Sequence, residues 1–316
     1  MTGPRRAFEA LMIALCAVAA SAAPAAEPPF QSRPLTRPGL FTRHIEGPAV
    51  GPAGDLFVPN LGRDGTVARI AVGSSKPTTF LRLPSGSIAN GARFDRGGRM
   101  FLADYKGHSI FVVAPGSRSP QIYFHSAEFH QPNDLAIALD GSLYASDPDF
   151  RGRNGRIWRI ASGEGGRVEG FVMAVDRIMG VANGVDLSPD EKTLYVSESN
   201  AGEIWAYAIE GGRLARPQRV IAFGQGAELD GLRTDADGRI FVARPGAGSI
   251  AVVEPGGSVL REIKTLGANP TNLTFGGPDG KTVFVTNAST RAVERFLTDR
   301  PGREFCWRMS SGCGAR

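Results

Sequence analysis

Six polar residues recur at one phase of an internal repeat and could together bind a cation. They are Glu46, Asn90, Asn133, Asn183, Asp230 and Asn272, at successive spacings of 44, 43, 50, 47 and 42 residues. Carboxylate and amide oxygens are the ligands that hard divalent cations prefer. Glu46, Asn133, Asn183 and Asp230 are the predicted metal ligands, because they combine two negative charges with two neutral amides. We expect one divalent cation, with calcium favoured over magnesium, manganese or zinc.

A simpler interpretation is that some of these residues only form turns. Asn or Asp before Gly often caps a tight turn. That interpretation accounts for Asn90 and Asn272 as well as a site does, but it does not account for Glu46. Asn90 therefore stays a candidate substrate contact rather than a predicted ligand.

The elements that must position these residues are short strands. A repeat of about 40–50 residues with strand-like content is typical of a β-propeller, with one blade for each repeat. Asp-Gly pairs between alternating apolar stretches predict hairpins at Asp140-Gly141, Asp237-Gly238 and Asp279-Gly280. Third strands are predicted at 67–72, 109–113, 156–160, 203–209, 249–253 and 292–297. The fold class is therefore all-β: a six-bladed propeller over residues 38–300, with a metal site in its central channel.

The ring must also close. The last repeat has three strands, so residues 39–45, which look strand-like, are predicted to supply its outer strand and remove an exposed edge. Residues 27–37 are rich in proline and without a period, and they are predicted to be an extended lead-in. Each phase-matched residue stands just before the innermost strand of its unit, so their side chains should converge at one mouth of the channel.

Both ends of the chain carry processing or tail signals. Arg5 and Arg6 precede an apolar stretch at 11–20 and then small residues, which predicts a secretory signal over residues 1–26. A general secretory route is favoured, with the twin-arginine route and an uncleaved anchor as alternatives. The mature protein is thus expected in the periplasm or outside the cell. There, Cys306 and Cys313 could form a disulfide in a tail over 301–316, although two free thiols are the alternative.

Composition narrows the partners. The charged fraction is 21%, the apolar fraction 42% and the net charge +5, and the basic residues are scattered. This pattern argues against nucleic-acid binding, and against a membrane partner once the signal is removed. No G-x-S-x-G or H-E-x-x-H motif suggests a nucleophile or a zinc protease site. A small-molecule substrate is expected, and nothing in the pattern specifies an oligomeric state.

Several units resemble the regucalcin–gluconolactonase family. The resemblance is carried by IEGPAV at 45–50, PNDLAIALDGSLYASDP at 132–148, NGVDLSPDEKTLYVSES at 183–199 and LDGLRTDADGRIFVA at 229–243. It implies a six-bladed propeller, one divalent metal in the channel and hydrolysis of lactones, often of sugar acids. It also implies that Glu46, Asn183 and Asp230 bind the metal and that Asn133 is a fourth ligand or a substrate contact. Asp230 would then be the candidate general base.

One departure from that family affects the substrate. Some sugar lactonases carry an arginine two residues before the asparagine of the third unit, and this chain has Gln131 there. Gln131 and Arg151, which lies in the loop 147–155, are therefore candidate substrate contacts. The predicted chemistry is metal-assisted attack of water on an ester carbonyl. A non-catalytic binding propeller and a hydrolase of aryl or phosphate esters remain as rival functions.

Overall fold

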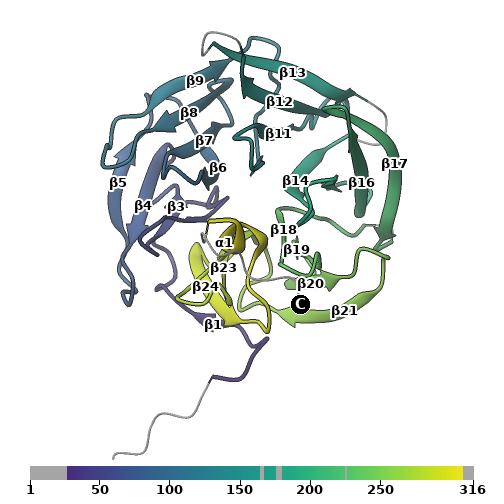
Figure 1. Ribbon diagram of the computed structural model, residues 1–316. Helices are drawn as coiled ribbons and strands as arrows, with labels where there is room; N and C mark the ends of the chain where they lie inside the picture. The colour runs from purple at the N-terminus through teal and green to yellow at the C-terminus, as the bar shows by residue number, and fades with distance from the viewer. Residues whose placement is uncertain (1–26, 164–166, 176–179, 225, 309–316) are drawn as a thin grey trace, which may run out of the picture.

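The fold is a closed ring of small antiparallel sheets. The computed structural model describes residues 27–163, 167–175, 180–224 and 226–308. Within those residues, six four-stranded sheets surround one axis, as the blades of a propeller do (Figure 1). The predicted all-β, six-bladed architecture is confirmed.

Each blade runs from an innermost to an outermost strand. The innermost strands are β2 (Ala49–Val50), β6 (Ala89–Phe94), β10 (Leu135–Ile137), β14 (Ala182–Leu187), β18 (Leu232–Thr234) and β22 (Pro270–Gly276). The second strands are β3 (Leu56–Pro59), β7 (Met100–Asp104), β11 (Leu143–Asp147), β15 (Thr193–Glu198), β19 (Ile240–Arg244) and β23 (Thr282–Asn287). Blades one to six are numbered below in the order of these innermost strands.

The outer half of each blade follows the same order. The third strands are β4 (Thr66–Ile70), β8 (Ser109–Val113), β12 (Arg156–Ser162), β16 (Glu203–Glu210), β20 (Ser249–Val253) and β24 (Ala292–Leu297). The outermost strands are β5 (Thr78–Arg82), β9 (Gln121–His125), β13 (Val168–Val175), β17 (Arg213–Ala222), β21 (Val259–Lys264) and β1 (Arg33–Pro34). The third strands lie within two residues of their predicted bounds.

Hairpin turns and packing between blades explain why the sequence forms this ring. Gly141, Gly238 and Gly280 have φ values of 84°, 84° and 74°, which glycine adopts without a side-chain clash. They lie in the turns between the first and second strands, as predicted. The apolar core fills the spaces between neighbouring blades, for example where Phe57 of blade one meets Phe94 of blade two. Burying such faces stabilises each blade against the next.

The strand that closes the ring is not the predicted one. β1 pairs antiparallel with β24, so Arg33 and Pro34, inside the predicted lead-in, provide the outer strand of blade six. The prediction for residues 39–45 was therefore wrong. Two residues with no apolar alternation give no strand signal, and proline is tolerated there because this is an edge strand.

Residues 39–45 lie against the turn between β23 and β24 of the same blade. The backbone nitrogens of Gly39 and Phe41 donate to the carbonyl oxygens of Thr290 and Arg291 at 2.9 and 3.2 Å. Phe41 also bridges Leu61 in blade one. The segment therefore links blades six and one instead of adding an outer strand.

Deleting residues 27–36 from the mature chain should lower the melting temperature by at least about 5 °C, because a shift of 1 kcal/mol moves Tm by roughly 2–4 °C in large domains. The deletion removes β1 and also the Phe30 nitrogen to Leu297 oxygen bond at 2.7 Å and the Glu27–Arg295 ion pair at 2.6 Å. Thermal unfolding compared with a chain that lacks only residues 1–26 measures the effect. Equal melting temperatures would show that β1 does not hold the ring closed.

The C-terminal segment is also part of the propeller rather than a tail beyond it. Helix α1 (Arg303–Arg308) lies at the inner end of blade six, beside the channel (Figure 1), and the side chain of Arg303 is 3% exposed. Arg303 binds Asp186, near the end of β14, at 3.0 Å. The phase-matched residue Asn183 lies near the start of β14, three residues before Asp186. A strand rises about 3.3 Å for each residue, so the two residues are about 10 Å apart along the strand. Helix α1 therefore closes the end of the channel opposite the predicted site.

Two predictions about the ends of the chain concern residues outside the described part. The signal over residues 1–26 and Cys313, the expected partner of Cys306, are among these residues. Both the processing and the disulfide stay predictions. Among the described residues, no helix has the length and apolar character needed to cross a membrane.

Candidate active site

The predicted site residues surround one cavity at the open mouth of the channel. The cavity has a volume of about 430 Å³. Five of the phase-matched residues line it: Glu46, Asn90, Asn133, Asn183 and Asp230. The other lining residues are Arg43, His44, Ile88, Tyr105, Phe150, Ser199, Asn200, Glu228, Leu229 and Pro245. The convergence that the repeat predicted is therefore present.

The glycine that follows four of these residues allows the blades to meet closely. A Cβ atom on Gly91 would lie 2.7 Å from the Asn133 carbonyl oxygen, and one on Gly184 would lie 2.4 Å from the Leu232 nitrogen. Gly91 also donates to the Asn133 carbonyl oxygen at 2.8 Å. Neither glycine, nor Gly47 or Gly231, has the left-handed backbone of a tight turn. The glycines therefore serve the contact between blades, and the turn interpretation does not explain the residues that precede them.

Four oxygen atoms in the cavity wall are buried without a hydrogen-bond partner among the described residues. They are the Oδ1 atoms of Asn90, Asn133, Asn183 and Asp230. A buried polar atom without a partner costs free energy, so such atoms usually serve a ligand. The amide nitrogen of Asn183 donates to Ser199 Oγ at 3.1 Å, which leaves its oxygen facing away from that bond. These four oxygens could together accept hydrogen bonds from, or coordinate, one ligand in the cavity.

The two carboxyl groups carry strongly shifted pKa values. Burial, followed by repulsion from Asp134, raises the pKa of Glu46 to about 8. Burial, followed by the charges of Glu46 and Asp134, raises the pKa of Asp230 well above its usual range. Two desolvated carboxylates that repel each other favour either protons or a cation. The two carboxylates and the unpartnered oxygens therefore both favour a positively charged ligand.

These residues fit a divalent cation with oxygen ligands. The fit rests on the unpartnered oxygens and the paired carboxylates, and the donor set is that of a hard ion. Within residues 27–308, apart from the gaps given above, no group of three or more His, Cys, Asp or Glu side chains could hold a metal. A metal here would therefore depend on the asparagine amides as well as on Glu46 and Asp230.

Three other predicted residues lie away from the cavity surface. Asn272 is fully buried, and its amide nitrogen reaches Glu46 Oε2 at 3.4 Å, so it supports Glu46 from behind. The Gln131 side chain hydrogen-bonds Tyr105, and Tyr105 itself lines the cavity. Arg151 is exposed, and its backbone nitrogen donates a hydrogen bond to Asp149 Oδ1 at 3.1 Å. From the loop 147–155, Phe150 rather than Arg151 reaches the cavity.

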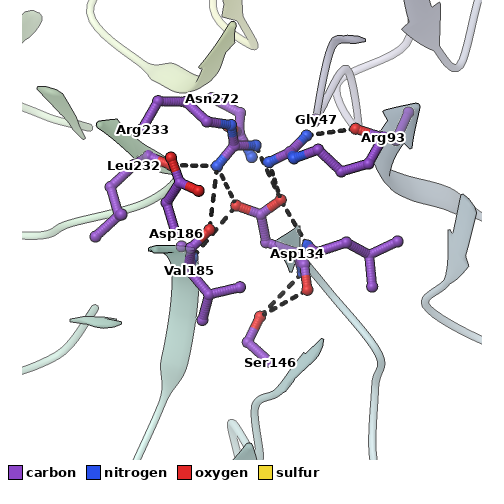
Figure 2. A network of polar contacts seen from close by, with 12 residues as sticks. Gly47, Arg93, Asp134, Ser146, Val185, Asp186, Leu232, Arg233 and Asn272 are labelled. Carbon is purple, nitrogen blue, oxygen red and sulfur yellow. Dashed lines mark hydrogen bonds and ion pairs between the residues drawn. The ribbon is translucent and has the colours of Figure 1, made fainter. Parts of the chain in front are cut away.

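A layer of buried ion pairs supports the site from below. The carboxylate of Asp134 lies between Arg93 and Arg233, each of which approaches it to 2.8 Å (Figure 2). All three side chains are at most 2% exposed. Buried charges persist only when they are paired, so this layer must form as a unit. Asp134 directly follows Asn133 in the chain, so the ion pairs of Asp134 fix the backbone that carries this site residue.

The same layer continues into helix α1. Arg93 Nε lies 3.2 Å from Glu304, and Arg303 lies between Asp186 and Glu191 at 3.0 and 3.2 Å. The C-terminal segment thus binds the same charge layer that fixes Asn133. Asp134 and its two arginines therefore lie between helix α1 and the cavity.

Several of these residues could have been found by extending the phase argument. Arg93, Asp186 and Arg233 each stand three residues after a phase-matched residue, in N-G-A-R, N-G-V-D and D-G-L-R. Tyr105 stands just after a second strand, at another shared phase. Arg43 and His44 precede Glu46 and carry no periodic signal, so only the structure places them at the cavity.

Known proteins share both sequence and fold with this chain. The family model described as SMP-30/Gluconolactonase/LRE-like region matches residues 66–289. The gluconolactonase of Zymomonas mobilis is 27% identical over 232 residues, which covers 65% of this chain and 63% of that protein, less than two thirds of its length. The diisopropyl-fluorophosphatase of Loligo vulgaris is 26% identical over 314 residues, which covers 88% of this chain and 98% of that protein.

A solved structure agrees with the propeller described above. The calcium-binding protein regucalcin from Agrobacterium tumefaciens superposes with a TM-score of 0.72 at 19% identity, covering 87% of this chain and 96% of that one. This likeness shows the shared fold, and the family model covers most of the ring. The chain, with its six-fold repeat and converging polar residues, therefore belongs to the SMP-30/gluconolactonase/LRE-like family.

Proposed function

We propose that this protein is an exported hydrolase that opens a lactone with the help of one divalent cation. The observation that carries the proposal is the set of three unpartnered asparagine oxygens around one cavity, together with the carboxyl groups of Glu46 and Asp230, whose pKa values are raised. The Zymomonas relative is named a gluconolactonase, which supports a cyclic ester as the substrate class. Calcium is the proposed ion, because every candidate ligand is an oxygen.

Each residue has a defined part in this proposal. Glu46, Asn133, Asn183 and Asp230 would hold the cation. When bound, the cation would draw electron density from the lactone carbonyl and make attack by water easier. Asp230 would accept the proton of the attacking water, because its carboxyl group lines the cavity and its Oδ1 atom has no hydrogen-bond partner among the described residues. The Asn90 oxygen, which has no other partner among the described residues, would accept a hydrogen bond from a substrate hydroxyl.

The cavity is suited to a small molecule. Its volume of about 430 Å³ lies within the usual range for small-ligand sites. Polar and charged residues make up most of the cavity lining, while Ile88, Phe150, Leu229 and Pro245 give apolar surface. A compact polyhydroxylated ring, such as a sugar-acid lactone, would match this mixture.

The rival functions explain less of the site. A scaffold propeller has no need to place two repelling, half-buried carboxyl groups and three unpartnered amide oxygens around one cavity at the cost of stability. The Loligo relative is named a diisopropyl-fluorophosphatase, so a phosphate ester is a useful comparison substrate. Export follows from the predicted signal over residues 1–26, which would place the protein in the periplasm or outside the cell.

Proton release during hydrolysis tests the proposal directly. The purified mature chain should open a panel of aldonolactones, lose this activity after treatment with a chelator, and regain it when calcium, magnesium, manganese or zinc is added back. A phosphofluoridate ester serves as the comparison arm. Thermal unfolding gives a second readout, because a cation that binds only the folded state raises Tm. Lactone opening that is insensitive to the chelator would contradict the cation, and turnover of the phosphofluoridate alone would contradict the substrate class.

A further inference from the structure

A second ring of residues surrounds the phase-matched ring. It consists of the residue that follows the second strand of each blade: Asn60, Tyr105, Pro148, Ser199, Pro245 and Ala288. Three of them, Tyr105, Ser199 and Pro245, line the cavity. The fold therefore presents a defined set of positions from which a side chain can reach a bound molecule.

Within this second ring, the hydroxyl of Tyr105 is the donor that is not already engaged by backbone. Ser199 Oγ donates to the Leu229 carbonyl at 2.6 Å, and Asn60 donates to the carbonyls of His44 and Ala89. The remaining three members have no side-chain donor. Tyr105 is thus the member of this ring whose side chain can donate to a molecule in the cavity.

The backbone of Tyr105 is held firmly in place. Its nitrogen donates to the Ile88 carbonyl at 3.0 Å. The preceding residue, Asp104, is 1% exposed, and its carboxylate accepts from the backbone nitrogens of Ile88 and Lys106 at 3.1 and 3.2 Å. A side chain mounted on such a fixed turn needs little reorganisation to act on a substrate.

Tyr105 and the proposed base Asp230 lie on opposite blades. Tyr105 belongs to blade two and Asp230 to blade five, and these blades lie on opposite sides of the six-bladed ring (Figure 1). A molecule in the cavity therefore has Asp230 on one side and Tyr105 on the other. Burial, and then the charges of Glu46 and Asp230, raise the pKa of Tyr105, so the phenol keeps its proton.

Gln131 is the polar neighbour of Tyr105. Its side-chain amide hydrogen-bonds the Tyr105 hydroxyl. An amide carries both a donor and an acceptor. When its nitrogen donates to the phenol oxygen, the phenol proton is left for an acceptor in the cavity. This contact gives Gln131, which does not line the cavity, a role behind Tyr105.

We propose that Tyr105 donates a hydrogen bond to the ring oxygen of the lactone as the ring opens, and that Gln131 is its positioning residue. The proposal rests on the lactonase function above. In the step, a C–O bond forms between water and the carbonyl carbon, and the bond from that carbon to the ring oxygen breaks. The proton that Asp230 takes from water returns to the ring oxygen, so Tyr105 stabilises the developing charge and transfers no proton.

Steady-state kinetics of Tyr105→Phe test this role. Losing a hydrogen bond that forms to a developing charge should lower kcat by about 10- to 100-fold while KM changes by less than about twofold. Tyr123→Phe, in the outer strand β9, is the matched control and should keep wild-type kinetics. Gln131→Met should lower kcat by about threefold to tenfold, and the double variant should be no slower than Tyr105→Phe, because the two residues act as one unit.

A comparison of leaving groups separates this role from a structural one. When an aldonolactone opens, its ring oxygen departs from the carbonyl carbon as an alkoxide. When dihydrocoumarin opens, its ring oxygen departs as a phenolate, which is more stable and needs less stabilisation by the enzyme. Tyr105→Phe should therefore cost at least about fivefold more in kcat with the aldonolactone. An active wild type with unchanged kcat in Tyr105→Phe, or an equal loss on both lactones, would overturn this inference alone. A wild type that opens neither lactone would overturn the proposed function and this inference with it.

Discussion

Replacing Asp230 with asparagine should lower lactone turnover by at least about 100-fold, because general-base catalysis contributes roughly 10²–10⁴ in rate. The substitution keeps the size of the side chain and one oxygen, but it removes the negative charge and the proton acceptor. It should also weaken the rise in melting temperature that a divalent cation produces, because one of two charged ligands is lost. Proton-release kinetics and thermal unfolding with and without calcium measure both effects.

The stability of this variant distinguishes a functional role from damage to the fold. Burial and repulsion from Glu46 raise the pKa of Asp230, so its charge opposes folding when no cation is bound. The chelated Asp230→Asn protein should therefore melt no lower than the chelated wild type. Glu228→Gln is the matched control, since Glu228 lies two residues away at the exposed rim of the same cavity. Wild-type turnover in Asp230→Asn would remove the proposed base from the mechanism.

Replacing Asp134 with alanine should reduce the free energy of unfolding by about 3–5 kcal/mol, the usual cost of removing one partner from a buried ion pair. The side chains of Arg93 and Arg233 are 1% and 2% exposed, and both bind this one carboxylate. Without it, two guanidinium groups would stay buried close together. Denaturant unfolding at neutral pH measures the loss. Glu254→Ala, at an exposed turn, should change the stability by less than about 0.5 kcal/mol, as surface substitutions usually do.

A double substitution tests whether the unpaired charge is the cause. If the cost of Asp134→Ala comes from stranded guanidinium groups, adding Arg233→Met should recover part of the stability, because a buried charge is replaced by an apolar side chain of similar length. Additive losses in the double variant would contradict this account, and so would a stable Asp134→Ala single variant. Either result would mean that the layer below the site does not depend on ion pairing.

The sequence by itself determined the architecture and the first ring of the site. The period that links Glu46 to Asp230 records one structural unit repeated around an axis, and residues at one phase must occupy one level of that axis. The Asp-Gly turns showed where three of the hairpins reverse, since glycine adopts a left-handed backbone without cost. Both signals are local in the chain, so the order of the amino acids is enough to recognise them.

Tertiary structure decided how the ring is closed and what lies around the site. β1 was unpredictable because its two residues, Arg33 and Pro34, pair with a strand about 260 positions away and have no pattern of their own. Arg233 and Asp134 are separated by 99 residues, and a charged residue in a strand usually indicates a solvated face. Tyr105 and Asp230 line one cavity although they are far apart in the chain, because blades two and five lie on opposite sides of the same channel. Periodicity reports what the repeats share, whereas closure, charge pairing and the second ring depend on contacts between residues that differ from blade to blade.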